Sequence, residues 1–150
     1  MSDEKPKGYK DLLVWRKGIE LVKSIYQLTQ RFPPNERFGL TSQVRRSAVS
    51  VPCNIAEGQA RHTTREFIHF ISNSEGSLAE VETHVVIAME LQYCTQKETE
   101  FVFGLIDELR RMLNGLRAET SREAAMNRPL SSLVPRHLSL VTRHLSLVTD

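Results

Sequence analysis

The sequence lacks most of the patterns that mark a catalytic or a secreted protein. Its two cysteines, Cys53 and Cys94, form no CxxC pair, so neither a disulfide framework nor a zinc ribbon is expected. The motifs GxGxxG, GxxxxGKS/T and GxSxG are absent, which removes the local support for dinucleotide, P-loop and nucleophile-elbow chemistry. Apolar runs extend for only a few residues, and the first residues, MSDEKPKGYKD, contain no apolar core of a signal peptide. We therefore expect a cytoplasmic chain that neither crosses a membrane nor carries a cofactor.

Charge is unevenly distributed along the 150 residues, although their net charge is only +2. Residues 1–66 carry 12 Lys and Arg against 7 Asp and Glu, a balance of +5, whereas residues 67–120 carry 4 against 9, a balance of −5. Residues 121–150 add 4 against 2. The two halves can complement one another within a fold or across a subunit contact, or the basic half can present a patch to nucleic acid. The charge distribution alone favours the first interpretation.

Hydrophobic periodicity predicts four helices and no strand in the first 120 residues. The first helix is expected over about residues 11–30, with the pair Pro33-Pro34 behind its end. The second is expected from near residue 38 or 41 to residue 57, with Gly58 as its C-terminal stop. Pro52 lies inside the second helix and removes one backbone hydrogen bond, so we expect a kink there.

The third and fourth helices are each marked by capping-box spacing, which begins at Thr63 and at Thr95. The rows expected to face the core are Trp15, Ile19, Val22 and Tyr26 beside Val14, Leu21, Ile25 and Leu28 in the first helix; Val44, Ala48, Val51 and Ile55 in the second; Phe67, Ile71, Ser74, Leu78, Val81, Val85 and Ala88 in the third; and Val102, Leu105, Ile106, Leu109, Met112, Leu113 and Leu116 in the fourth. The steps of four and three in the third helix are typical of bundle packing. Short connections between these helices predict an all-α, antiparallel up-and-down four-helix bundle.

The chain divides into three parts on this reading. Residues 1–10 form an N-terminal arm, residues 11–120 the bundle and residues 121–150 a tail. The tail repeats a seven-residue unit, SLVPRHL, SLVTRHL and SLVTD, whose copies are nearly identical. Such copies indicate a recent tandem duplication, and we expect the tail to be disordered and dispensable for stability.

Metal and nucleophile chemistry finds little support. One Glu-x-x-His pair, Glu66 and His69, resembles half of a di-iron site, but the second copy that such bundles need is missing. Glu80 and His84 lie on the same helix as that pair and are interpreted as surface residues. Both cysteines are interpreted as small buried residues. We expect no bound metal and no enzymatic activity.

The most informative segment is residues 40–58, LTSQVRRSAVSVPCNIAEG. A row of small or polar side chains, Ser47, Ser50, Asn54 and Gly58, predicts a closely packed helix seam whose polar groups satisfy carbonyls freed by Pro52.

Arg45 and Arg46 lie beside that seam, and they have two interpretations. They can form buried ion pairs with Glu57, Glu75 or Glu80, or they can point outward to phosphates. Because consecutive helix residues point about 100° apart, a structural role is expected for at least one of the two. A basic surface is expected from Lys17, Arg45, Arg46, Arg61 and Arg65. No aromatic residue alternates with these cations in the sequence, so contacts to nucleic-acid backbone and shape are expected rather than base stacking.

The segments YKDLLVWRKGIELVKSIY and FPPNERFGLTSQVRRSAVSVPCNIAEG, followed by a helix with GSLAEVE, carry a family resemblance. From Tyr9 to Glu119 the chain resembles the four-helix bundle protein family, whose members include proteins encoded by intervening sequences inside bacterial 23S rRNA genes. The positions that match are Trp15, Gln43, Arg45, Arg46, Ser50, Pro52, Asn54, Glu57 and Gly58.

The resemblance implies a short antiparallel bundle that assembles into a homopentameric ring, and it implies no enzymatic activity. A related branch, the accessory proteins of diversity-generating retroelements, binds nucleic acid and a reverse transcriptase. Two functions follow as expectations. The first is a non-enzymatic protein that binds structured RNA or DNA through its basic surface, and the second is a ring-shaped adaptor or scaffold for a protein partner.

Overall fold

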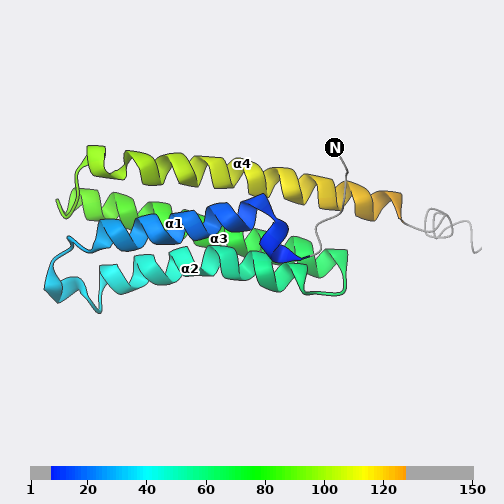
Figure 1. Cartoon of the computed structure of the whole chain (residues 1–150), viewed down its shortest axis with the longest axis horizontal. Coiled ribbons are helices and arrows are strands. Elements are labelled where there is room, and N and C mark those ends of the chain that lie inside the picture. The colour runs from blue at the N-terminus through cyan, green and yellow to red at the C-terminus, as the bar shows by residue number, and fades with distance from the viewer. Residues whose placement is uncertain (1–7, 128–150) are drawn as a thin grey trace, which may run out of the picture.

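The computed structural model describes residues 8–127, and every regular element in that range is helical (Figure 1). The elements in order are the 3-10 turn η1 (Tyr9–Asp11), α1 (Leu13–Thr29), the 3-10 turn η2 (Pro34–Glu36), α2 (Leu40–Gln59), α3 (Thr64–Glu90) and α4 (Gln96–Met126). The four long helices lie side by side and run along one common direction in Figure 1. The α1–α2 and α3–α4 connections lie at one end and the α2–α3 connection at the other. The prediction of an all-α protein with four helices is confirmed for these residues.

Each long helix packs on two others, in the cycle α1–α2, α2–α3, α3–α4 and α4–α1. The contact between α2 and α3 is the most extensive of the four. A single apolar core runs along the centre and is formed by aliphatic side chains from all four helices. The largest fully buried members are Leu21, Ile25, Val44, Val51, Ile55, Ile71, Leu78, Val81, Val85, Ile106, Leu109 and Leu113.

Two predicted helix starts are confirmed. The Thr63 Oγ1 accepts a hydrogen bond from the backbone N–H of Glu66 at 3.2 Å, and α3 begins at the next residue, Thr64. Thr95 and Glu98 form a complete capping box at the start of α4. The backbone hydrogen bond from Thr95 lowers the pKa of the Glu98 carboxyl, because it stabilises the charged form.

The predicted core rows of α2 and α3 are confirmed, but one of the two rows of α1 is not. In α3, six of the seven predicted positions are buried and Phe67 is partly buried. In α1, the row with Leu21 forms core, whereas Ile19 and Tyr26 in the other row are 37% and 43% exposed. The apolar stripe of α1 is wider than the surface that two neighbouring helices can cover, so its edge stays at the surface.

Two glycines permit close approach of helices. A Cβ at Gly18 of α1 would lie 3.1 Å from the Cβ of Pro52, so the proline ring of α2 packs where α1 has no side chain. A Cβ at Gly58 would lie 2.7 Å from the Cβ of Phe70 on α3. Gly58 is therefore a contact position and not the helix stop that its place suggested. Helix α2 continues to Gln59, and no glycine among residues 8–127 has a positive φ.

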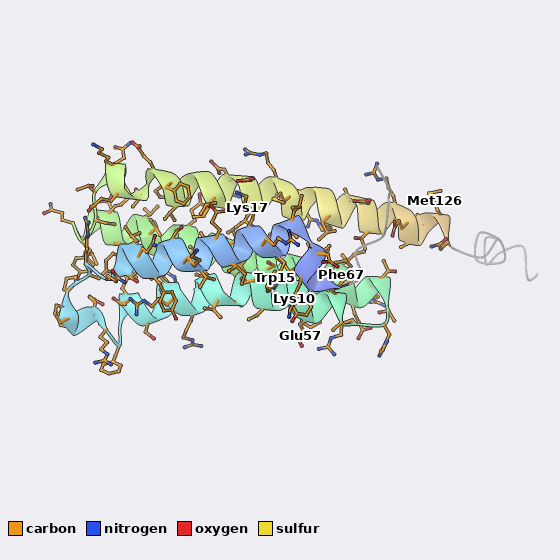
Figure 2. All side chains as sticks on the ribbon, in the orientation of Figure 1. Lys10, Trp15, Lys17, Glu57, Phe67 and Met126 are labelled. Atoms are coloured by element: carbon orange, nitrogen blue, oxygen red, sulfur yellow. The ribbon has the colours of Figure 1, made fainter. Side chains whose placement is uncertain are left out.

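The fourth helix extends past residue 120, where the predicted tail begins. Helix α4 continues to Met126, which Figure 2 shows beyond the ends of the other three helices. The repeated part of the predicted tail lies within residues 128–150 and so outside the described residues, as do residues 1–7 of the predicted arm. None of the helices within residues 8–127 is long and apolar enough to cross a membrane.

Candidate functional site

The five cations predicted to form a basic surface do not share one surface. Lys17 lies between α1 and α4 (Figure 2), where its Nζ is 3.0 Å from Glu20 Oε2 and 3.3 Å from Glu108 Oε2. Hydrogen bonds to Glu20 and Glu108 hold the pKa of Lys17 above its ordinary value. This ammonium is already paired with two carboxylates and bridges two helices.

Arg61 and Arg65 lie near the α2–α3 connection. Arg61 pairs with Glu57 one helical turn before it, and its guanidinium carbon is 4.8 Å from the ring centre of Phe70. Arg65 is exposed in the first turn of α3 and forms no ion pair with any residue among 8–127. Of these two cations, only Arg65 lacks a carboxylate partner among the described residues, so only Arg65 can offer its charge to a ligand.

Arg45 and Arg46 behave differently from one another, as their angular separation predicted. Arg45 is half-buried, donates from Nε to Thr29 Oγ1 at 2.8 Å, and has its guanidinium carbon 4.5 Å from the ring centre of Tyr26. Arg46 is exposed.

The predicted ion pairs of Arg45 and Arg46 with Glu57, Glu75 or Glu80 are wrong. Glu57 pairs with Arg61, Glu75 pairs with Arg117, and Glu80 accepts a hydrogen bond from Ser47. Each carboxylate has a different partner.

A groove between α1 and α2 collects arginines and aromatic rings, and we call it the Arg–aromatic groove. Its volume is about 650 Å³, and it is lined by Tyr26, Arg37, Phe38, Thr41, Ser42, Arg45, Arg46, Val49 and Ser50. Three of these residues are arginines and none is acidic. Phe38 is 89% exposed, and the guanidinium carbon of Arg37 is 5.5 Å from its ring centre. Two aromatic rings, Tyr26 and Phe38, thus lie beside three arginines in the folded chain, although none alternates with the predicted cations in the sequence.

The turn that carries Phe38 is anchored on both sides. Glu36 Oε2 accepts a hydrogen bond from the backbone N–H of Leu40 at 2.9 Å, and Glu36 Oε1 accepts one from the Tyr93 hydroxyl at 3.0 Å. The second bond raises the pKa of Tyr93, because the carboxylate stabilises the protonated phenol. A side chain at Gly39 would collide with the Glu36 carboxylate. Both carboxylate oxygens of Glu36 therefore accept hydrogen bonds that hold the turn, while the side chain of Phe38 is exposed to solvent.

A second groove, between α2 and α3, is polar and internally bonded. It has a volume of about 480 Å³ and is lined by Gln43, Arg46, Ser47, Ser50, Ser77, Glu80 and His84. Ser47 Oγ donates to Glu80 Oε2 at 2.9 Å, and Ser77 Oγ donates to Ser50 Oγ at 2.9 Å. Nδ1 of His84 is buried and has no hydrogen-bond partner among the described residues. Of the predicted row of small and polar residues, Ser47 and Ser50 bond to α3 here, whereas Asn54 and Gly58 do not line this groove.

The polar groups near Pro52 do not act as expected. Asn54 Nδ2 donates to the Ser50 carbonyl, and Ser74 Oγ donates to the Val51 carbonyl, both at 2.9 Å. The carbonyl that a proline at position 52 deprives of its helical donor is that of Ala48. These side chains therefore tie α2 to itself and to α3 without replacing the missing bond.

Both grooves lie within the part of the chain that matches a known family. The family model of the 23S rRNA-intervening sequence protein matches residues 10–115. The chain belongs to this family. A comparison with curated proteins gave no match.

Three further residues that carry the family resemblance make contacts within the bundle. Trp15 is partly buried and packs edge-on against Tyr9, with ring centres 5.3 Å apart. Gln43 lines the polar groove, and Glu57 holds Arg61 at the end where α2 meets α3 (Figure 2).

The cysteines of this family member differ from one another. Cys53 is exposed, so the expectation of two buried cysteines holds only for Cys94. Burial raises the pKa of the Cys94 thiol, and the nearby Glu98 charge adds to that effect. Among residues 8–127, no group of three or more His, Cys, Asp or Glu residues gathers to hold a metal ion.

Arg110 and Arg117, two of the four arginines of α4, are paired with carboxylates. Arg110 pairs with Glu82 of α3 and with Asp107 one turn away, and Arg117 Nη1 is 3.1 Å from Glu75 Oε2. Sequence reasoning missed Phe38 and Tyr26 as members of a basic site, since they come from a connecting turn and from another helix. The segment FPPNERFG offered one signal, because a large apolar residue beside Arg and Gly in a turn lacks an obvious core partner.

Proposed function

We propose that this protein is a non-enzymatic, oligomeric bundle that binds nucleic acid through the Arg–aromatic groove. The observation that carries the proposal is the gathering of three arginines without an acidic residue at one groove. Clustered arginines supply the electrostatic attraction that dominates affinity for phosphate backbones. The name of the family, which refers to an intervening sequence of 23S rRNA, agrees with an RNA setting. A cytoplasmic location is part of the proposal.

Arg45 and Arg46 have complementary parts in this proposal. Arg45 is oriented by Thr29 and Tyr26 through its Nε and its guanidinium plane. Its terminal amino groups form no hydrogen bond with any residue among 8–127 and are available to a phosphate. Arg46 lines both grooves and has no ion pair among the described residues, so it extends the positive surface toward α3. Arg65 adds a separate cation, whereas Lys17 and Arg61 are held by carboxylates.

Self-association belongs to the same proposal. We propose an antiparallel up-and-down bundle that forms a head-to-tail ring, with a pentamer as the state that the family resemblance implies. The helices α1 and α2 carry an excess of basic residues and α3 an excess of acidic ones, which gives adjacent subunits complementary surfaces. If this charge matching contributes, the mass from light scattering falls, or the oligomer melts earlier, at high salt. An unchanged mass and melting temperature would contradict the electrostatic part.

The function is tested by light scattering on a sizing column with absorbance read at 260 and 280 nm. The expected result of this experiment is an oligomer. In a separate titration with a labelled RNA, the association constant should fall steeply with salt, and the logarithm of this constant should fall by about 0.7 to 0.9 per phosphate contact for each unit of log salt concentration. Variant Arg46→Gln should reduce the slope by about one such contact, whereas the control Arg117→Gln should not change it. Absent or salt-insensitive binding would contradict nucleic-acid association.

A second candidate function is a protein adaptor, and the outer face of α3 favours it. Val86 and Ile87 near the end of α3 and Leu91 directly after it are 44%, 40% and 50% exposed, and they make a small cluster of exposed apolar side chains. A ring could present this cluster to a protein partner. Variant Ile87→Ser separates the two candidates: loss of a partner isolated after nuclease treatment, with RNA binding intact, supports the adaptor. Unchanged partner recovery contradicts a role for this face.

A further inference from the structure

We infer that the Arg–aromatic groove takes an unpaired, single-stranded stretch of nucleic acid, with a base stacked on the ring of Phe38. This inference rests on the proposed function, because it specifies which form of nucleic acid the groove binds. The chemistry of recognition is then twofold, phosphates at the arginines and a base at the aromatic ring.

The first support is the exposure of Phe38 on an anchored turn. Its side chain is 89% exposed, while Glu36 holds the turn through the backbone N–H of Leu40 and the hydroxyl of Tyr93. Because the backbone of the turn is already held, stacking of a base on this ring needs to order only the Phe38 side chain. Stacking of a base on an aromatic side chain contributes about 1–3 kcal/mol by alanine substitution and tolerates any base.

The second support is the arrangement of cations around two rings. The guanidinium of Arg37 lies 5.5 Å from the ring centre of Phe38, and that of Arg45 lies 4.5 Å from the ring centre of Tyr26. Both rings and both arginines line the same groove, with Arg46 beside them. Positively charged grooves with aromatic rings are the combination that binds single strands.

A duplex uses this arrangement poorly. In a double helix each base is already stacked on its neighbours, so the face of an additional ring finds no partner without unstacking. A duplex would contact the arginines through its phosphates and leave the Phe38 ring without a stacked base. The exposed ring therefore favours the single strand over the double strand.

The test compares two labelled probes by fluorescence anisotropy at one fixed salt concentration. The first probe is an oligouridylate, which has no stable base pairing. The second is a G·C-paired hairpin of the same length whose strands are joined by a non-nucleotide linker, so that it has no unpaired base. The variants are Phe38→Leu, which keeps an apolar side chain without a ring, and the control Phe101→Leu, which removes an exposed ring of α4 that is outside the groove. Arg46→Gln and light scattering on every variant complete the set.

The expected result is tighter binding of the oligouridylate than of the hairpin. Phe38→Leu should weaken oligouridylate binding by about ten-fold, which corresponds to about 1.4 kcal/mol, and leave hairpin binding unchanged. Phe101→Leu should change neither.

Three outcomes overturn the inference. If Arg46→Gln weakens both probes while Phe38→Leu weakens neither, the proposed function stands and the stacking inference falls. If neither probe binds, or if Arg46→Gln has no effect, the proposed function fails and the inference fails with it. If Phe38→Leu changes the oligomeric mass, Phe38 is a contact between copies of this chain and not a stacking platform.

Discussion

The arginines of the Arg–aromatic groove and two arginines of α4, Arg110 and Arg117, lie in opposite environments. Arg45 lies over Tyr26 and bonds a threonine, whereas Arg110 and Arg117 are each held by carboxylates from α3. An arginine that faces a carboxylate has its charge compensated, and one that faces an aromatic ring keeps it. The position of a charge in the sequence is therefore a poor guide to a binding surface. Availability of an acidic partner decides which cations can meet a phosphate.

The largest effect is expected from removal of the groove arginines. In the triple variant Arg37→Gln, Arg45→Gln, Arg46→Gln, RNA affinity should fall on the order of 100-fold, because even two lost charge-assisted hydrogen bonds at about 1.5 kcal/mol each suffice. Anisotropy measures the affinity, and circular dichroism checks that the bundle remains folded. The matched variant Arg110→Gln, Arg117→Gln should stay within about two-fold, since its charges are already paired. Equal losses in both variants would break the comparison.

Substitutions in the seam between α2 and α3 should change the free energy of unfolding and leave RNA affinity unchanged. Gly58→Ala places a Cβ 2.7 Å from the Cβ of Phe70, and the resulting overpacking should cost about 1–3 kcal/mol of the free energy of unfolding. The control Gly76→Ala has open space around its Cβ and should stabilise the helix by about 0.5–1 kcal/mol. Urea unfolding measures both. A gain in stability for Gly58→Ala equal to that for Gly76→Ala would show that the seam is not closely packed.

Release of an α4 arginine tests the comparison directly. Glu75→Gln removes the carboxylate that holds Arg117, and a partly exposed pair of this kind contributes about 0.2–1 kcal/mol to stability. RNA affinity should remain within about two-fold, because Arg117 lies on α4 and not at the groove. An affinity gain well above that would mean that the freed arginine joins the binding surface.

The smallest effect is expected at Lys17. Its ammonium is shared by Glu20 and Glu108, so Lys17→Gln should leave RNA binding nearly unchanged although Lys17 lies in the basic half of the sequence. Because the pKa of Lys17 is raised in the folded state, its contribution to stability is present below the ordinary value of 10.5 and is lost as the pH rises above it. Unfolding of the wild type and the variant is measured from neutral to alkaline pH. The difference between their free energies of unfolding should shrink only above pH 10.5. A difference that shrinks near neutral pH would contradict the pairing.

The sequence predicted the fold well because the fold depends on local periodicity. The row from Ile71 to Ala88 repeats in steps that place every member on one face, and the two threonine caps are encoded within four residues.

The site was harder to predict because its members meet only in the folded chain. Tyr26 was assigned to the core because its row on α1 has helical spacing, and nothing in that row shows which edge stays uncovered. Phe38 belongs to a turn whose geometry depends on Glu36 reaching Tyr93, which is 57 residues away in the chain. The pairs of Arg110 and Arg117 with α3 likewise depend on packing, so the free cations could not be separated from the compensated ones.

The most direct test of the account is photo-crosslinking of the full chain to an RNA that carries 4-thiouridine, with the crosslinked peptides identified by mass spectrometry. The Arg–aromatic groove predicts crosslinks on the tryptic peptides that contain Tyr26 (residues 24–31) or Phe38 (residues 38–45). These crosslinks should disappear in the triple arginine variant. Crosslinks confined to α3 and α4 would contradict the central claim that uncompensated arginines between α1 and α2 form the nucleic-acid site.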